Sequence, residues 1–204
     1  MNAPKPYDSP LRRRQQAATR EAILEGVALL VEEGGLSAVS FAAVAARAGV
    51  QERTVYRHFA SRSALLEAFW TWINEQAGIP GFPTQERDLT TKPPVFFPGF
   101  DRRARMMAAL IFSEDGREFR LRVNEERQRA YRAVLAGRIA GLDPATATQV
   151  CAVIQLLYGA TAWATMRDYW QLDGKASGEA IAWAIDRLLA AVSAGDVPPL
   201  AKSE

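Results

Sequence analysis

The stretch GVQERTVYRHF, residues 49–59, gathers polar and basic side chains of several kinds around Val55. An arginine can fork onto guanine and a threonine can meet a base edge. Tyrosine and histidine can donate to phosphate oxygens. Two interpretations compete: the solvated face of an ordinary helix, or a helix face that lies against a polyanion. The side chains with this chemistry are Arg53, Thr54, Tyr56, Arg57 and His58.

The composition argues against a catalytic or metal-binding protein. Cys151 is the only cysteine and His58 the only histidine. These counts exclude an internal disulfide, a cysteine-based zinc site, a multi-histidine metal site and a histidine-based catalytic relay. We therefore expect no enzyme, no catalytic residues, no cofactor and no metal.

The positive charge is concentrated near the N-terminus. The formal net charge is only +2, but residues 1–62 hold nine Lys/Arg against six Asp/Glu. This distribution points to a polyanionic partner at that end. Residues 1–16 are proline-rich and then basic, and we expect a flexible arm there. Its Arg12, Arg13 and Arg14 either neutralise phosphates, enter the minor groove or serve only as a solubilising tail.

Two short predicted helices must position the basic stretch. Ser40 is placed to cap a helix over 41–48, and Gly49 permits a tight turn before a second helix over about 51–59. Helical geometry then points Val55 and Phe59 inward and the polar side chains outward. Backbone N–H groups at the helix starts, Ser40 and Gln51, add anion-binding donors. This arrangement is a helix-turn-helix.

The rest of the chain also predicts helices. The segment 78–100 contains five prolines and forbids a continuous helix, and helical patterns resume near Asp101. An uncharged run over 144–166 contains glutamines and threonines, so we expect a helix buried in a bundle and no membrane span. The first residues have no apolar run typical of a secretory signal. We expect an all-α, soluble, cytoplasmic protein of about nine helices.

The segment TREAILEGVALLVEEGGLSAVSFAAVAARAGVQERTVYRHFASRSALLEA, residues 19–68, resembles the DNA-binding domain of the tetracycline-repressor (TetR) family. The AARAGV turn, the TVYRHF helix and the following SRSALLEA carry the resemblance. It implies a three-helix DNA-binding domain, here over 17–77, and a helical ligand-binding and dimerisation domain over 78–204. It also implies a ligand-responsive regulator, most simply a repressor that binds a palindromic operator as a dimer.

The resemblance also assigns roles to residues. Thr54, Tyr56 and His58 fall on DNA-contacting positions, Ser40 on a phosphate-contacting helix start, and Arg62 where the family usually has a phosphate-facing lysine. Glu52 stands where small polar residues are common, and its carboxylate repels phosphate unless it reads a cytosine amino group. The full set of candidate DNA-binding residues is Arg12, Arg13, Arg14, Ser40, Gln51, Arg53, Thr54, Tyr56, Arg57, His58 and Arg62.

For the C-terminal part, the resemblance favours a cavity for a hydrophobic or aromatic effector over a plain aromatic core. We expect a homodimer formed by the two C-terminal helices, which would bury their apolar surplus in a two-fold interface. The alternative to a regulator is a helical bundle that binds protein partners without DNA. The candidate ligand-binding residues are Phe97, Phe100, Met107, Phe112, Gln155, Tyr158, Trp163 and Asp168.

Overall fold

The computed structural model describes residues 10–79 and 81–199, and the described residues are helical with no strand. The chain divides into two compact units, residues 1–72 and 73–204. This all-α architecture confirms the predicted fold class. None of the helices in the described ranges is long and apolar enough to cross a membrane.

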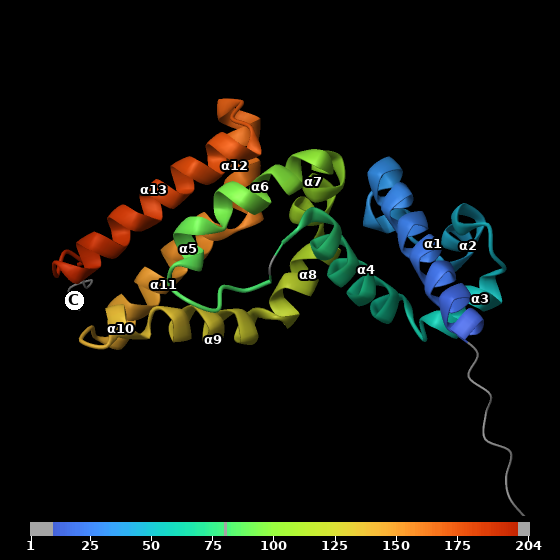
Figure 1. Ribbon diagram of the computed structural model, residues 1–204, viewed down its shortest axis with the longest axis horizontal. Coiled ribbons are helices and arrows are strands. Elements are labelled where there is room, and N and C mark those ends of the chain that lie inside the picture. Colours follow the sequence, from blue (N-terminus) through green and yellow to red (C-terminus); the bar gives the residue numbers. More distant parts are fainter. Residues whose placement is uncertain (1–9, 80, 200–204) are drawn as a thin grey trace, which may run out of the picture. The chain divides into compact units, whose positions relative to one another are not determined.

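The first unit contains the predicted helix-turn-helix (Figure 1). The long helix α1 packs against α2, and α2 packs against α3. A short 3₁₀ turn, η1, connects α1 to α2. The elements are α1 (Pro10–Gly34), η1 (Leu36–Ala38), α2 (Phe41–Ala48), α3 (Glu52–His58) and the first part of α4 (Arg62–Ala77), which crosses the unit boundary.

The second unit is a bundle of short and long helices in which α13 packs along α6 and α5 (Figure 1). Its aromatic core is formed mainly by α6, α11, α12 and α13. The helices are α5 (Asp88–Thr91), α6 (Pro93–Arg102), α7 (Ala104–Phe112), α8 (Glu114–Arg122), α9 (Asn124–Val134), α10 (Ala136–Ile139), α11 (Pro144–Tyr158), α12 (Ala160–Trp170) and α13 (Gly174–Ser193).

The described residues form thirteen α-helices instead of the expected nine, because local breaks divide the longer predicted runs. Ser113 accepts a hydrogen bond from the Gly116 N–H and starts α8 anew. The predicted helix from Pro144 toward Trp170 breaks at Gly159. Helix also begins earlier than Asp101: α6 starts at Pro93, since a proline in the first helical turn sacrifices no intrahelical hydrogen bond.

One carboxylate connects three helices of the second unit. The Asp101 side chain, on α6, accepts a 2.8 Å hydrogen bond from the Trp163 indole N–H on α12. Its second oxygen accepts a 2.5 Å bond from the Gly174 backbone N–H at the start of α13. Both partners lie far from Asp101 in sequence, so this residue fixes the relative placement of the helices around the aromatic core.

Small residues let α13 approach the backbone of α6 closely. A Cβ atom added at Gly178 would lie 2.5 Å from the Pro93 carbonyl oxygen, and one at Gly174 would lie 2.5 Å from that of Phe97. Ser177, between them, is fully buried. The α6–α13 contact therefore depends on the absence of side-chain volume at these glycines.

Gly178→Ala should lower the free energy of unfolding by about 1–3 kcal/mol, because the added methyl group must push two backbones apart. Urea unfolding followed by circular dichroism measures this change. Gly137→Ala is the matched control, since Gly137 lies in helix α10 with no atom within 4 Å of the added Cβ. The control should be neutral or stabilised, and equal stability of the two variants would contradict the close packing.

Candidate nucleic-acid interface

The helix α3 is held by its apolar side and presents its polar side to solvent. Val55 and Phe59 are buried, with exposed fractions of 0% and 3%, which confirms their predicted inward orientation. Thr54 and His58 are half-buried at the margins of the helix. The exposed members of the predicted set on and beside α3 are Gln51, Arg53, Tyr56 and Arg57.

The turn before α3 has the geometry that the sequence predicted. Gly49 adopts a left-handed conformation with φ of 65°, which strains any residue with a side chain, and its N–H donates to the Ala45 carbonyl. Val50 donates to the same carbonyl at 3.0 Å. The Ser40 hydroxyl accepts a 3.2 Å bond from the Ala43 N–H and caps α2 as expected.

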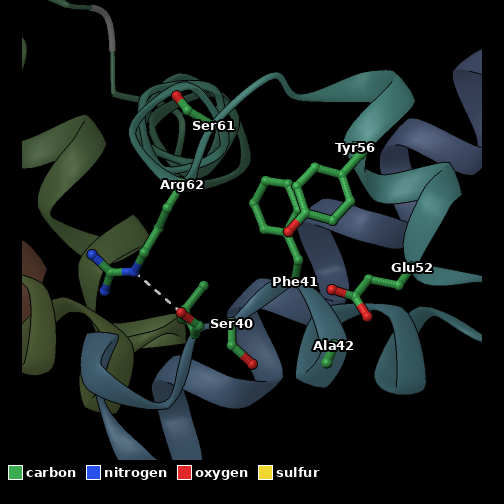
Figure 2. A pocket seen from close by; sticks show the side chains of 8 residues that line it. Ser40, Phe41, Ala42, Glu52, Tyr56, Ser61 and Arg62 are labelled. Atoms are coloured by element: carbon green, nitrogen blue, oxygen red, sulfur yellow. Dashed lines mark hydrogen bonds between the residues drawn. The ribbon is translucent and has the colours of Figure 1, made fainter.

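A hollow lies where the starts of α2 and α4 approach α3 (Figure 2). Ser40 caps α2, and Ser61 caps α4 by accepting a 3.1 Å hydrogen bond from the Ala64 N–H. Helix N-termini carry partial positive charge and favour anions. The hollow can therefore receive a phosphate group. Its lining residues are Val39, Ser40, Phe41, Ala42, Glu52, Tyr56, Ser61 and Arg62.

The ring of Tyr56 packs against the ring of Phe41. The ring centroids are 4.3 Å apart and the rings are tilted by 57°. Phe41 is 8% exposed, whereas Tyr56 is 56% exposed. Phe41 thus supplies an apolar surface against which the Tyr56 ring packs at the hollow (Figure 2).

The structure gives Arg62 a role that sequence reasoning missed. Its Nε donates to the Val39 carbonyl at 3.1 Å, and its Nη2 donates to the Leu36 carbonyl at 2.8 Å. These bonds secure η1 and the chain before α2 to the start of α4. Figure 2 shows the bond to the Val39 carbonyl. Because Val39 and Leu36 lie more than 20 residues before Arg62, local sequence patterns carry no signal for these two bonds.

The expected flexible arm is wrong for residues 10–16, because these residues form the first turns of α1. Residues 1–9 of the expected arm lie outside the described residues. Arg12, Arg13 and Arg14 are exposed on α1, and their run of polar and alanine neighbours is compatible with helix once it joins the apolar repeat that follows. A helix presents these side chains in fixed directions, unlike an arm.

The basic side of α1 and the end of α3 share a hollow. Arg13, Arg20, Arg57 and His58 all line it. Burial, together with the charges of Arg57 and Arg20, lowers the pKa of His58 below its ordinary value. Arg20 was not among the predicted residues, although Arg13, Gln16 and Arg20 follow helical spacing along one face of α1.

Five of the eight predicted ligand-binding residues lie in one buried aromatic cluster of the second unit. The Phe100 ring lies 5.2 Å from that of Trp163 and 5.6 Å from that of Phe97. Two rings that the prediction did not include, Phe96 and Tyr131, join the cluster at 5.3 Å and 6.1 Å from Tyr158. The five predicted members are Phe97, Phe100, Met107, Tyr158 and Trp163.

Three predicted ligand-binding residues lie outside this cluster. Gln155 is half-buried on α11. Phe112 is 68% exposed at the end of α7, because the buried face of that helix contains residues 106, 107, 110 and 111. Asp168 is exposed and pairs with Arg167 at 2.6 Å. For Phe112 and Asp168, the placement corrects the prediction that they line a cavity.

The aromatic cluster contains an unsatisfied polar atom. The Tyr158 hydroxyl is buried and has no hydrogen-bond partner. Burial raises the pKa of Tyr158, and the Asp88 carboxylate adds to the rise, so the phenol stays protonated and able to donate. A buried hydroxyl without a partner costs about 1–3 kcal/mol, and a bound molecule with an acceptor would remove that cost.

Residues 23–69 match the family model described as bacterial regulatory proteins, tetR family. The matched residues contain α2, the Gly49 turn and α3 with its exposed polar side. This part of the chain is a TetR-family DNA-binding domain. The chain is a DNA-binding transcriptional regulator, and the alternative of a bundle that binds only proteins does not account for this match.

Solved structures share the fold of the chain over most of its length. NalD from Pseudomonas aeruginosa, described as the secondary repressor of the MexAB-OprM multidrug efflux pump, is 20% identical with a TM-score of 0.62. The similarity covers 85% of this chain and 96% of NalD. A TetR-family regulator from Rhodococcus sp. is 22% identical with a TM-score of 0.56, over 85% of this chain and 99% of the other. No curated protein sequence matches the chain significantly.

Glu52→Gln should tighten binding of this TetR-family regulator to mixed-sequence duplex DNA by about two- to fivefold, about 1 kcal/mol or less. The reason is that an exposed carboxylate on the α3 hollow repels approaching phosphates, and an exposed charge is strongly screened. Fluorescence anisotropy at low salt measures the affinity. Glu118→Gln, an exposed substitution on α8 with the same change of charge, is the control and should leave binding unaltered.

Proposed function

We propose that this TetR-family regulator is a repressor that binds a two-fold symmetric operator as a homodimer and leaves it when a hydrophobic or aromatic effector binds. The observation that carries the proposal is the outward presentation of the polar side of α3. Its buried Val55 and Phe59 prevent the helix from turning that side inward. A helix of this kind enters the major groove and reads base edges.

In this proposal some side chains on and beside α3 contact base edges and others contact phosphates. Thr54 and Arg53 contact base edges, and Gln51 lies beside them at the start of the helix. Tyr56, Arg57 and His58 contact phosphates, as do Ser40 and Arg62. Arg12, Arg13 and Arg14 extend the phosphate contacts along α1.

A homodimer places two copies of α3 on successive turns of the duplex, about 34 Å apart. An uncharged stripe on α11 supports the dimer. Val153 and Leu156 are 42% and 58% exposed, with Gln149 and Ala152 beside them at helical spacing. Trp183 on the neighbouring α13 is 67% exposed. An isologous four-helix interface of α11 and α13 would bury this apolar surface.

The effector site of the proposal is the aromatic cluster around Tyr158. Its rings offer apolar contact, and the unpartnered Tyr158 hydroxyl offers one directional hydrogen bond. The effector would favour a conformer whose two α3 helices no longer match the groove spacing. Such coupling between the effector and DNA needs only about 1–3 kcal/mol.

Replacing Arg12, Arg13 and Arg14 together with alanine should weaken DNA binding for every sequence. Alanine keeps α1 helical while the phosphate contacts disappear. The slope of log K against log salt should flatten by about 0.9 for each phosphate that the variant no longer neutralises. Titrations of one duplex at several salt concentrations measure this slope.

The control triple variant replaces Arg105, Arg117 and Arg129, three exposed arginines of the second unit. It changes the net charge equally, and its salt slope should equal that of the wild type. An unaltered slope in the Arg12–Arg14 variant would remove these residues from the interface, and a flattened slope in the control would place a second nucleic-acid surface on the other unit.

Leu156→Glu should weaken the dimer by at least about tenfold, equivalent to 1.4 kcal/mol, because the interface would then bury an unpaired carboxylate. Sedimentation equilibrium measures the association. Leu121→Glu on α8 is the matched control, since Leu121 is 53% exposed and lies outside the proposed interface. Dissociation in the Leu121 variant but not in the Leu156 variant would move the interface to α8.

A further inference from the structure

A basic hollow lies between α1 and the end of α3. It has two adjoining parts that share Gln16, Arg57 and His58. Arg13 and Arg20 line the first part, and Arg12 lines the second, which has a volume of about 750 Å³. Both helices belong to the first unit. The residues that line it are Arg12, Arg13, Gln15, Gln16, Ala17, Ala18, Thr19, Arg20, Arg57 and His58.

All the charged side chains that line this hollow are basic. Four arginines and the only histidine of the chain line it, and none of its lining residues is acidic. The Arg20 guanidinium is held in place by stacking on the Phe59 ring, 4.5 Å from the ring centroid. The basic side chains that line the first part, Arg13, Arg20, Arg57 and His58, favour an anion there.

We propose that this hollow binds a phosphate of the DNA backbone, and that His58 takes up a proton when the phosphate enters, so that affinity for duplex DNA rises as pH falls. The inference rests on the proposed DNA-binding function of α3. It adds Arg20 and Gln16 to the interface and makes the binding dependent on pH.

The charges around His58 explain why the proton arrives with the phosphate. In the free protein, burial and the charges of Arg57 and Arg20 lower the pKa of His58, so the ring is neutral at neutral pH. A neutral imidazole has one N–H donor, and a protonated one has two. A phosphate in the hollow would offset both arginines and accept a hydrogen bond from the charged ring, which raises the pKa of His58 in the complex.

The direction of the pH dependence follows from these two pKa values. Between the lower value of the free protein and the higher value of the complex, the complex binds more protons than its separate components. Affinity therefore rises as pH falls through this window and levels off below the pKa of the free protein. The other charged groups facing His58 are Arg57 from its own helix and Arg12, Arg13 and Arg20 from α1.

The single histidine makes the test direct. The imidazole proton resonances of the full chain are followed by NMR from pH 5.5 to 8, alone, with a mixed-sequence 30-base-pair duplex, and with inorganic phosphate. The duplex should raise the pKa of His58 by about one pH unit, which corresponds to an affinity higher by up to about tenfold for each bound subunit at pH 5.5 than at pH 8. Anisotropy at constant ionic strength measures that affinity.

Two substitutions connect the effect to the hollow. His58→Gln should remove the dependence of duplex affinity on pH in this window. Arg20→Gln should raise the pKa of His58 in the free protein, since one of the charges that lower it is gone, and should weaken duplex binding. Arg129→Gln on α9, an exposed substitution with the same change of charge, should alter neither quantity. Circular dichroism confirms that each variant is folded.

The outcomes separate the two proposals. A duplex that binds with the expected salt dependence while the pKa of His58 stays constant or falls would overturn the proton-linked site and leave the DNA-binding function standing. A rise with inorganic phosphate but not with the duplex would assign the hollow to a small oxyanion and overturn the DNA contact. Absence of any duplex binding would overturn both the regulator proposal and this inference.

Discussion

Burial of Val55 and Phe59 is the constraint on which the DNA-binding surface depends. These two side chains fix the rotation of α3 about its own axis, and a helix of seven residues has no other means of choosing the side that it exposes. The left-handed Gly49 sets the angle at which α3 leaves α2. Once both are fixed, Arg53, Tyr56 and Arg57 must face solvent.

Neighbouring residues then turn this exposed helix into a site for an anion. The capped starts of α2 and α4 open onto one side of α3, with Tyr56 oriented by Phe41. The arginines of α1 lie on the other side, next to His58. Helix α3 therefore has a hollow on each side, and both hollows have N–H donors or positive charge that can bind phosphate.

The sequence predicted the helix-turn-helix well because its signals are local. The apolar spacing of Val55 and Phe59, the Ser40 cap and the Gly49 turn each act within one or two turns of helix. Long-range contacts were not predictable in the same way: the bonds from Arg62 to two carbonyls and from Asp101 to Trp163 join residues far apart in sequence. The missed start of α1 has a different cause, because a basic run without apolar spacing carries no helical signal of its own.

The C-terminal unit shows the limit of reading aromatic residues from sequence. Phe100 and Trp163 meet in the core, whereas Phe112 points to solvent, and only the register of α7 distinguishes these outcomes. The sequence likewise did not indicate that the Tyr158 hydroxyl would lack a hydrogen-bond partner. Both features arise from packing between helices, which composition and periodicity do not specify.

Selection of bound fragments from genomic DNA, followed by hydroxyl-radical footprinting of the best fragment, tests the central claim most directly. A dimer that presents two α3 helices should protect two patches related by two-fold symmetry, centred about 34 Å apart along the duplex. Random fragments with no shared motif, or a single unsymmetric patch, would contradict the account.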